Sequence, residues 1–188
     1  MNQLWQMWES GISTKIVDSI IQECECYDPA PGQTGFDGRG SNDTRNSTVR
    51  WIDKNDKNSK FIADLIWDYG QEANCKAFGF DIDFLNEIQY TVYDSKHKDH
   101  YAWHADTFWA NPTAYDRKLS IVIQLSDPSE YSGGFFELSS EYEQPSPISL
   151  RKKGTVLVFP SFLSHRVTPV TSGVRKSLVS WIQGPKFR

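Results

Sequence analysis

The chain has 188 residues, of which 38% are hydrophobic and 23% charged, a composition that fits one folded domain and excludes a disordered protein. The aromatic content of 14% favours β structure, because bulky rings pack well on half-buried pleated surfaces. The formal net charge of −4 gives no reason to expect a polyphosphate partner, and no apolar run is long enough to suggest a membrane span.

Cysteine usage and the first residues indicate the compartment. Cys24, Cys26 and Cys75 are an odd number and lack the spacing of a disulfide framework or a zinc site, so we expect reduced thiols. The first residues also lack the basic and then apolar pattern of a signal peptide. We therefore expect a cytoplasmic protein.

Two segments in the first half have apolar residues at helical spacing. We expect helices over residues 13–27, with Ser13 as the N-cap, and over residues 59–75. Residues 28–53 between them are rich in Gly, Pro, Asn, Asp and Ser and carry Arg39, Arg45 and Arg50. A loop of this length is usually functional or disordered, and we interpret it as a mobile loop beside a binding site.

After residue 78 the pattern changes to short strands separated by turn residues. We expect strands over residues 87–93, 100–106, 118–125, 134–138, 155–159, 165–167 and 175–182. The chain has no repeat, linker or break in composition. We therefore predict a single domain over residues 1–188, mostly β, in which helices and a loop in residues 1–77 support a sandwich or barrel formed by residues 78–188.

The first candidate for chemistry lies in the strand expected over residues 100–106. Residues two apart share a face of a strand, so His104 and Asp106 project together, while Tyr101 and Trp103 project to the other side and pack behind them. Residues 107–109 would begin the rim of the site. Such a pair alone is more often an ordinary polar pair than a metal site.

His165, which follows an apolar strand and a Pro-Ser turn, supplies a third candidate ligand. Two histidines and one carboxylate on one face of an octahedral ion leave three positions open, as in non-haem Fe(II) oxygenases. Mn, Co, Ni or Zn fit similar ligands, so the residues alone do not identify the metal.

A cationic residue follows ten positions after His165. Arg175 shares a strand face with Ser177 and Trp181, and a guanidinium beside a hydroxyl suits a carboxylate ligand. Since the apolar neighbours Leu178 and Val179 suggest burial on both sides, an Arg175 without an anionic partner would be costly.

Together, His104-x-Asp106, His165 and Arg175 resemble the Fe(II)- and 2-oxoglutarate-dependent dioxygenases. YAWHAD, RKLSIVIQLSDPSEYSGGFFEL and LVFPSFLSHRVTPVTSGVRKSLVSWIQGP resemble the prolyl 4-hydroxylase-like, PKHD-type branch and its small microbial and phage members. The resemblance covers roughly residues 87–188, and the first half matches mainly through RNSTVRW. It implies a double-stranded β-helix, the jelly roll shared with cupins.

The resemblance also implies roles for single residues. His104, Asp106 and His165 would bind Fe(II), and Arg175 would bind the distal carboxylate of 2-oxoglutarate. The remaining pocket residues would be Tyr93 and Gln124 as lining, Ser177 beside Arg175 and Trp181 near the metal. Gln124 stands where relatives often have a Tyr.

The implied reaction uses O2 to hydroxylate an unactivated C–H bond while 2-oxoglutarate is decarboxylated to succinate and CO2, with ascorbate as a candidate reductant. The implied substrate is a prolyl residue of a peptide or protein, and a free amino acid or other small molecule is the alternative. Nucleic acid is not expected, because demethylase relatives carry a second Arg where this chain has Trp181. No membrane partner is expected, and Asp106 argues against a halogenase, whose chemistry needs that position vacant.

Two further readings stay open. His100 lies four residues before His104, but its surroundings favour a loop and then a strand; we expect at most a pocket contact from His100 and no site role for His97. A non-catalytic, cupin-like metal-binding module would explain the three ligands. It would leave Arg175 and Ser177 without a role.

Overall fold

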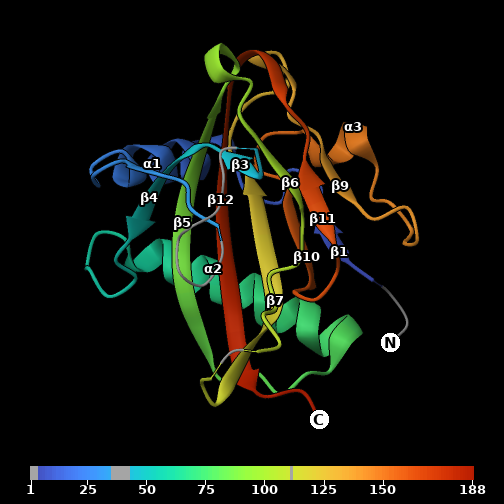
Figure 1. Ribbon diagram of the computed structural model, residues 1–188. Helices are drawn as coiled ribbons and strands as arrows, with labels where there is room; N and C mark the ends of the chain where they lie inside the picture. The colour runs from blue at the N-terminus through green and yellow to red at the C-terminus, as the bar shows by residue number, and fades with distance from the viewer. Residues whose placement is uncertain (1–3, 35–42, 111) are drawn as a thin grey trace.

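The computed structural model describes residues 4–34, 43–110 and 112–188, which fold into two facing β-sheets with helices on one outer side (Figure 1). The larger sheet is eight-stranded and antiparallel throughout, in the order β1-β10-β7-β12-β5-β4-β2, with β8 paired to β12. Its strands are β1 (Gln6–Trp8), β10 (Val156–Pro160), β7 (Tyr115–Gln124), β12 (Val170–Pro185), β5 (Phe84–Asp94), β4 (Thr48–Ile52), β2 (Ala30–Pro31) and β8 (Tyr131–Gly133).

The smaller sheet has four antiparallel strands in the order β3-β6-β11-β9. They are β3 (Arg45–Asn46), β6 (His100–His104), β11 (His165–Val167) and β9 (Phe136–Leu138). Two facing antiparallel sheets of this kind form a jelly roll. The predicted fold class, mostly β with N-terminal helices, is confirmed.

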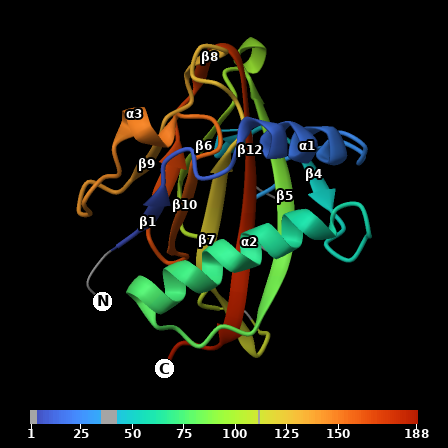
Figure 2. The same cartoon turned by 180° about the vertical axis from the view of Figure 1, so that it is seen from behind.

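The helices cover the outer face of the larger sheet, as seen from behind in Figure 2. These are α1 (Thr14–Cys24) and α2 (Lys60–Ala73), and α2 is followed by a π-helical turn, η1 (Asn74–Phe78). Strand alternation divides the core: Ile121 and Ile123 of β7 pack toward the helices, whereas Val122 packs toward the smaller sheet. The inner face of the larger sheet is thus left to line the space between the sheets.

Both predicted helices are present. The Ser13 hydroxyl accepts a hydrogen bond from the backbone N–H of Ile16, which is the expected N-cap interaction of α1. In α2, a Cβ at Gly70 would lie 2.1 Å from Cδ1 of Ile182, so the glycine lets the helix approach β12 closely. No helix in residues 4–34, 43–110 and 112–188 is long and apolar enough to cross a membrane.

All seven predicted strands are present, but some of their ends differ. β12 runs from Val170 to Pro185, well beyond the expected residues 175–182, because it pairs with β5, β7 and β8 along its length. β6 ends at His104, so Asp106 lies just outside the strand. The strands before α2 (β1, β2, β3 and β4), β8 and the short helices η2 (Ser95–His97) and α3 (Pro147–Leu150) were not predicted from the sequence.

The prediction of a mobile loop over residues 28–53 is wrong for the residues described. The segment contains β2, β3 and β4, and β4 pairs with β5 from Thr48 opposite Val92 to Ile52 opposite Ile88. Residues 35–42, with Arg39, lie outside the described residues. The strands of the sheets are therefore not confined to residues 78–188, because the chain before α2 supplies both edge strands of the larger sheet and one edge strand of the smaller sheet.

A glycine between α3 and β10 gives the first testable prediction. Gly154 has φ +80° and a Cβ there would lie 2.1 Å from the carbonyl oxygen of Ile12, whereas Gly79 has φ +65° with open space around it. We expect Gly79→Ala to lower the free energy of unfolding by about 1 kcal/mol, through backbone strain alone. Gly154→Ala should lower it by more than about 2 kcal/mol, because strain and a backbone clash add. Urea denaturation measures both, and equal losses would contradict the proposed contact.

Candidate metal centre

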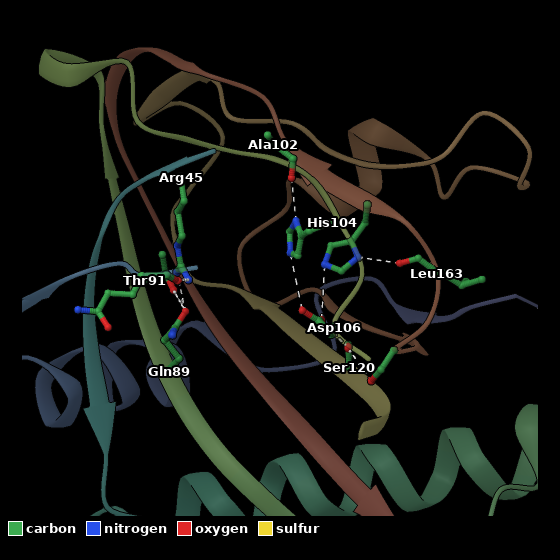
Figure 3. A network of polar contacts seen from close by, with 11 residues as sticks. Arg45, Gln89, Thr91, Ala102, His104, Asp106, Ser120 and Leu163 are labelled. Carbon is green, nitrogen blue, oxygen red and sulfur yellow. Dashed lines mark hydrogen bonds and ion pairs between the residues drawn. The ribbon is translucent and has the colours of Figure 1, made fainter. Parts of the chain in front are cut away.

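Two paired strands of the smaller sheet bring two histidines together. His104 ends β6 and lies directly opposite His165, which begins β11, with ring centroids 4.2 Å apart. Asp106 follows two residues after β6, where its backbone N–H donates to the carbonyl oxygen of Ser161 at 2.8 Å. This bond turns the chain so that the carboxylate faces the two rings (Figure 3).

Hydrogen bonds orient both imidazoles. Nδ1 of His104 lies 2.8 Å from the carbonyl oxygen of Ala102, and Nδ1 of His165 lies 2.9 Å from that of Leu163 (Figure 3). Because a carbonyl oxygen only accepts, each Nδ1 carries the proton and each Nε2 keeps a free lone pair. These Nε2 atoms lie 3.7 and 3.5 Å from the carboxylate oxygens of Asp106, with all three candidate ligand atoms within 4.8 Å of one another.

The surroundings favour the protonation states that a metal needs. Burial first, and then the charge at His165, lower the pKa of His104 to about 4. Burial raises the pKa of Asp106, but His165, His104 and Arg117 together outweigh it and lower the pKa to about 2. At neutral pH His104 is therefore a neutral imidazole and Asp106 a carboxylate, the forms that bind a metal ion.

Ser120 of β7 supports the carboxylate from the larger sheet. Its hydroxyl donates to Oδ2 of Asp106 at 2.6 Å and lies 2.9 Å from the hydroxyl of Ser161 (Figure 3). Two nitrogen donors, one oxygen donor and oriented outer partners fit Fe(II) or a similar divalent ion. No other group of three His, Cys, Asp or Glu residues in the described part of the chain comes together in this way.

The three residues open into a cavity of about 830 Å³ between the sheets. Four other residues predicted for the site also line it, all from the inner face of the larger sheet: Tyr93 of β5 and Arg175, Ser177 and Trp181 of β12. The sheet register places Arg175 opposite Tyr93, and the guanidinium carbon lies 5.5 Å from the tyrosine ring centre.

Arg175 is a buried cation without an anionic partner. It is 3% exposed, it donates to the hydroxyl of Ser177 at 3.4 Å, and it forms no ion pair with any described carboxylate. Burying an uncompensated charge costs free energy, so this position suits a ligand carboxylate.

The indole of Trp181 also belongs to the cavity wall. It is buried, the guanidinium of Arg117 lies 3.9 Å over its ring, and its Nε1–H has no hydrogen-bond partner among the residues that the structure describes. An unpaired buried donor in a cavity is available to a ligand.

Gln124 does not line this cavity. Its side-chain amide donates to the hydroxyl of Tyr131 at 2.9 Å, and it borders a separate small cavity behind Arg175. The residue predicted from the resemblance therefore does not line the space beside the metal ligands, and its side chain is held by Tyr131 instead.

Tyr101 lies on the same face of β6 as His104, and the prediction that it projects to the other side is wrong. Its ring stacks on that of His104, with centroids 3.5 Å apart and planes at 11°, and it lines the cavity. In the pairing with β11, Val167 lies opposite Tyr101 and His165 opposite His104, so β6 has one extra residue. This bulge places residues three apart on one face, against the simple alternation that the prediction assumed.

Trp103 and the other candidates lie away from the metal ligands. Trp103 is 45% exposed, with the guanidinium of Arg166 over its ring, instead of packing behind the histidine. His100 lies within hydrogen-bond distance of two backbone carbonyl oxygens, and neither it nor His97 lines the cavity. Of residues 107–109, Thr107 and Phe108 line the cavity, as expected for its rim.

A jelly roll with two histidines and one carboxylate lining its cavity defines a protein of the non-haem metal oxygenase class. The family model described as the 2OG-Fe(II) oxygenase superfamily matches residues 88–183, and the chain belongs to this superfamily. Membership implies Fe(II) and 2-oxoglutarate as the metal and the co-substrate. The two histidines and the carboxylate described above fit the metal, and the buried Arg175 fits a carboxylate of the co-substrate.

Curated relatives match over part of their length. A PKHD-type hydroxylase of a Synechococcus species is 40% identical over 83 residues, which are 44% of this chain and 36% of the relative. One from Hyphomonas neptunium is 43% identical over 65 residues, which are 35% of this chain and 28% of the relative. The chain thus spans about a third of the length of the curated relatives that it matches.

Solved structures share the fold over nearly the whole chain. A prolyl-4-hydroxylase of Pseudomonas putida has a TM-score of 0.73 at 18% identity, covering 98% of this chain and 94% of the other. A prolyl hydroxylase of Trichoplax adhaerens, in complex with a hypoxia inducible factor peptide fragment, has a TM-score of 0.75 at 15% identity, covering 96% and 83%. The predicted jelly roll of the double-stranded β-helix type is confirmed.

The contact between Ser120 and Asp106 gives a prediction for metal binding. Ser120→Ala removes the donor that holds the carboxylate, so we expect Fe(II) to bind about 10- to 100-fold more weakly. Anaerobic titration calorimetry measures this. Ser180→Ala is the matched control, because Ser180 is equally buried but donates to the carbonyl oxygen of Glu87 on the helix side of the sheet. Unchanged affinity in Ser120→Ala would show that the serine does not orient the ligand.

Proposed function

We propose that this protein is an Fe(II)- and 2-oxoglutarate-dependent dioxygenase that hydroxylates an unactivated C–H bond, with a prolyl residue of a peptide or protein as the foremost substrate. The observation that carries the proposal is the presence in one cavity of the three candidate metal ligands and the unpaired, buried Arg175. A non-catalytic metal-binding module would have no use for that cation.

In this proposal each site residue has a distinct task. His104, Asp106 and His165 hold Fe(II), and Asp106 offsets one of its charges. Arg175 binds the distal carboxylate of 2-oxoglutarate, with the Ser177 hydroxyl beside the guanidinium. The metal and co-substrate, when bound, supply the oxidising chemistry: O2 gives one oxygen atom to the substrate C–H and one to succinate, with release of CO2.

Apolar side chains lie beside the metal ligands. The rings of Phe136 and Phe159 lie 5.5 and 4.9 Å from that of His165, and Val122 and Val179 line the cavity from the larger sheet. A dry wall protects reactive species from side reactions and strengthens the ionic contacts inside.

The cavity mouth supports a peptide substrate. Trp51, Phe108 and Tyr115 all line the cavity and are all exposed, and aromatic grooves of this kind suit an extended, proline-containing chain. The Trichoplax adhaerens relative was solved with a peptide fragment, which favours the same reading. A free amino acid is the alternative substrate, ascorbate is a candidate reductant, and a cytoplasmic location stays a prediction.

Replacement of Arg175 separates co-substrate binding from metal binding. We expect Arg175→Gln to weaken 2-oxoglutarate binding at least about thirtyfold, because a buried charged partner is lost, while Fe(II) affinity stays within about threefold. Titration calorimetry with each ligand measures both. Arg166→Gln is the control, since this surface arginine pairs with Glu137 next to His165 and does not line the cavity. Unimpaired 2-oxoglutarate binding in Arg175→Gln would contradict the assignment.

The activity itself is tested by mass spectrometry of candidate prolyl peptides and free amino acids incubated with the protein. We expect a mass increase of one oxygen atom that requires both Fe(II) and 2-oxoglutarate, with formation of an equal amount of succinate. His165→Ala should abolish both products. A protein that binds Fe(II) yet consumes no 2-oxoglutarate with any of these candidates would overturn the proposal.

A further inference from the structure

A second buried arginine lines the same cavity from β3, the strand next to the one that carries His104 (Figure 3). Arg45 of β3 is 6% exposed and reaches across from the smaller sheet to the larger one. Its Nε donates to the Ser47 hydroxyl at 2.9 Å, one terminal nitrogen donates to Oε1 of Gln89 at 2.7 Å, and the other donates to the backbone carbonyl of Gln33 at 3.3 Å.

All of these partners are neutral, so the charge of Arg45 has no counterion among the described residues. The carboxylates that line the cavity are engaged elsewhere. Glu87 pairs with Arg117 at 2.9 Å, Asp106 faces the two histidines, and Asp116 accepts from the backbone N–H of Phe187 at 2.8 Å. Arginine is rarely buried without a paired anion, because the desolvation of the guanidinium is then uncompensated.

Arg45 and Arg175 mark different places in the cavity. Arg175 lies opposite Tyr93 of β5, whereas Arg45 contacts Gln89, which lies opposite Val179. Four residues along a strand correspond to about 13 Å. A small dicarboxylate that binds both Arg175 and the metal therefore does not also reach Arg45. The positive charge of Arg45 then still lacks an anion.

A ring stack connects Arg45 to the metal ligands. Its guanidinium carbon lies 4.6 Å from the ring centre of Tyr101, and the Tyr101 ring stacks on His104 at 3.5 Å. An anion held at Arg45 would thus lie one aromatic ring away from a metal ligand. This separation suits a molecule whose reacting carbon and anionic group are only a few bonds apart.

We propose that Arg45, with Gln89 and Ser47, binds a carboxylate of the substrate that is hydroxylated. The inference rests on the proposed function and narrows its substrate to one with a carboxylate close to the reacting C–H bond. The carboxylate is that of a free amino acid or of an acidic residue or chain end beside the reacting residue of a peptide. Both sources share the same chemistry, a planar anion that accepts two N–H donors.

The anion site is tested first without turnover, with acetate and acetamide as probes. The protein is loaded with Mn(II) and 2-oxoglutarate, so that the metal and Arg175 are occupied, and the Arg45 Nε–H resonance is followed by ¹⁵N NMR. We expect acetate to shift it saturably and acetamide to bind at least about tenfold more weakly. Acetate that leaves this resonance unmoved would overturn the proposal.

Variants distinguish a binding role from a merely structural bridge between the sheets. Gln89→Glu places a carboxylate beside Arg45 in nearly the same shape, so we expect a higher melting temperature and at least about tenfold weaker acetate binding. If Arg45 has only a structural role, Gln89→Glu should raise the melting temperature without changing acetate binding. Arg45→Lys should keep part of the affinity. Arg50→Gln is the matched control, because Arg50 lies on the neighbouring β4, bonds to the backbone of Tyr27 and does not line the cavity.

Two matched pairs then identify the source of the carboxylate. L-proline is compared with L-prolinamide, and a blocked peptide with Pro-Glu is compared with the same peptide with Pro-Gln. If L-proline binds more tightly than L-prolinamide, the carboxylate is that of a free amino acid. If the Pro-Glu peptide binds more tightly than the Pro-Gln peptide, the carboxylate belongs to a peptide. In either case the preference should be lost in Gln89→Glu. Equal binding within both pairs would overturn the assignment to the substrate. If acetate binds at Arg45 but no candidate drives 2-oxoglutarate consumption, the proposed function fails and the anion site stands.

Discussion

The antiparallel pairing of β6 with β11 is the constraint on which the site depends. It sets His104 and His165 opposite each other, and local carbonyl oxygens then fix both rings with their Nε2 atoms toward Asp106. The two histidines are sixty-one residues apart in the chain, so their proximity is a property of the smaller sheet and of no local motif. Everything else in the cavity is positioned relative to this pair.

The extra residue in β6 has consequences beyond the ligands. It turns Tyr101 onto the same face as His104, where the tyrosine ring separates a metal ligand from the guanidinium of Arg45. A regular strand would have placed Tyr101 on the outer face and left the two sides of the cavity unconnected. One irregularity therefore shapes both the metal site and the surroundings of Arg45.

The sequence predicted the parts of the site that a short spacing or a strand face reveals. His104, Asp106, His165 and Arg175 come together in the cavity as the spacing suggested, and the two amphipathic helices and the main strands are present. Tyr101 was misplaced because alternation along a strand cannot reveal a bulge. Gln124 was misplaced because its orientation depends on Tyr131, a contact that only the tertiary structure creates.

Arg45 illustrates a different limit of prediction. It lies in a two-residue strand within a segment rich in turn residues, and its partners come from the residues after β2, from β5 and from β6. Neither periodicity nor composition places so short a strand in a sheet. Its burial, and the neutrality of its partners, become visible only when the two sheets are assembled.

Asp106 also joins the two sheets. Its backbone and side chain bond to Ser161 and Ser120, which belong with β10 and β7 of the larger sheet, while the histidines that it faces belong to the smaller one. An ion bound here would link the halves of the sandwich through three ligands. Its binding free energy would then add to the cohesion of the fold, since a ligand that binds only the folded state stabilises it. The metal would then stabilise the fold in addition to its chemical role, and its loss would lower the stability of the two sheets around the cavity.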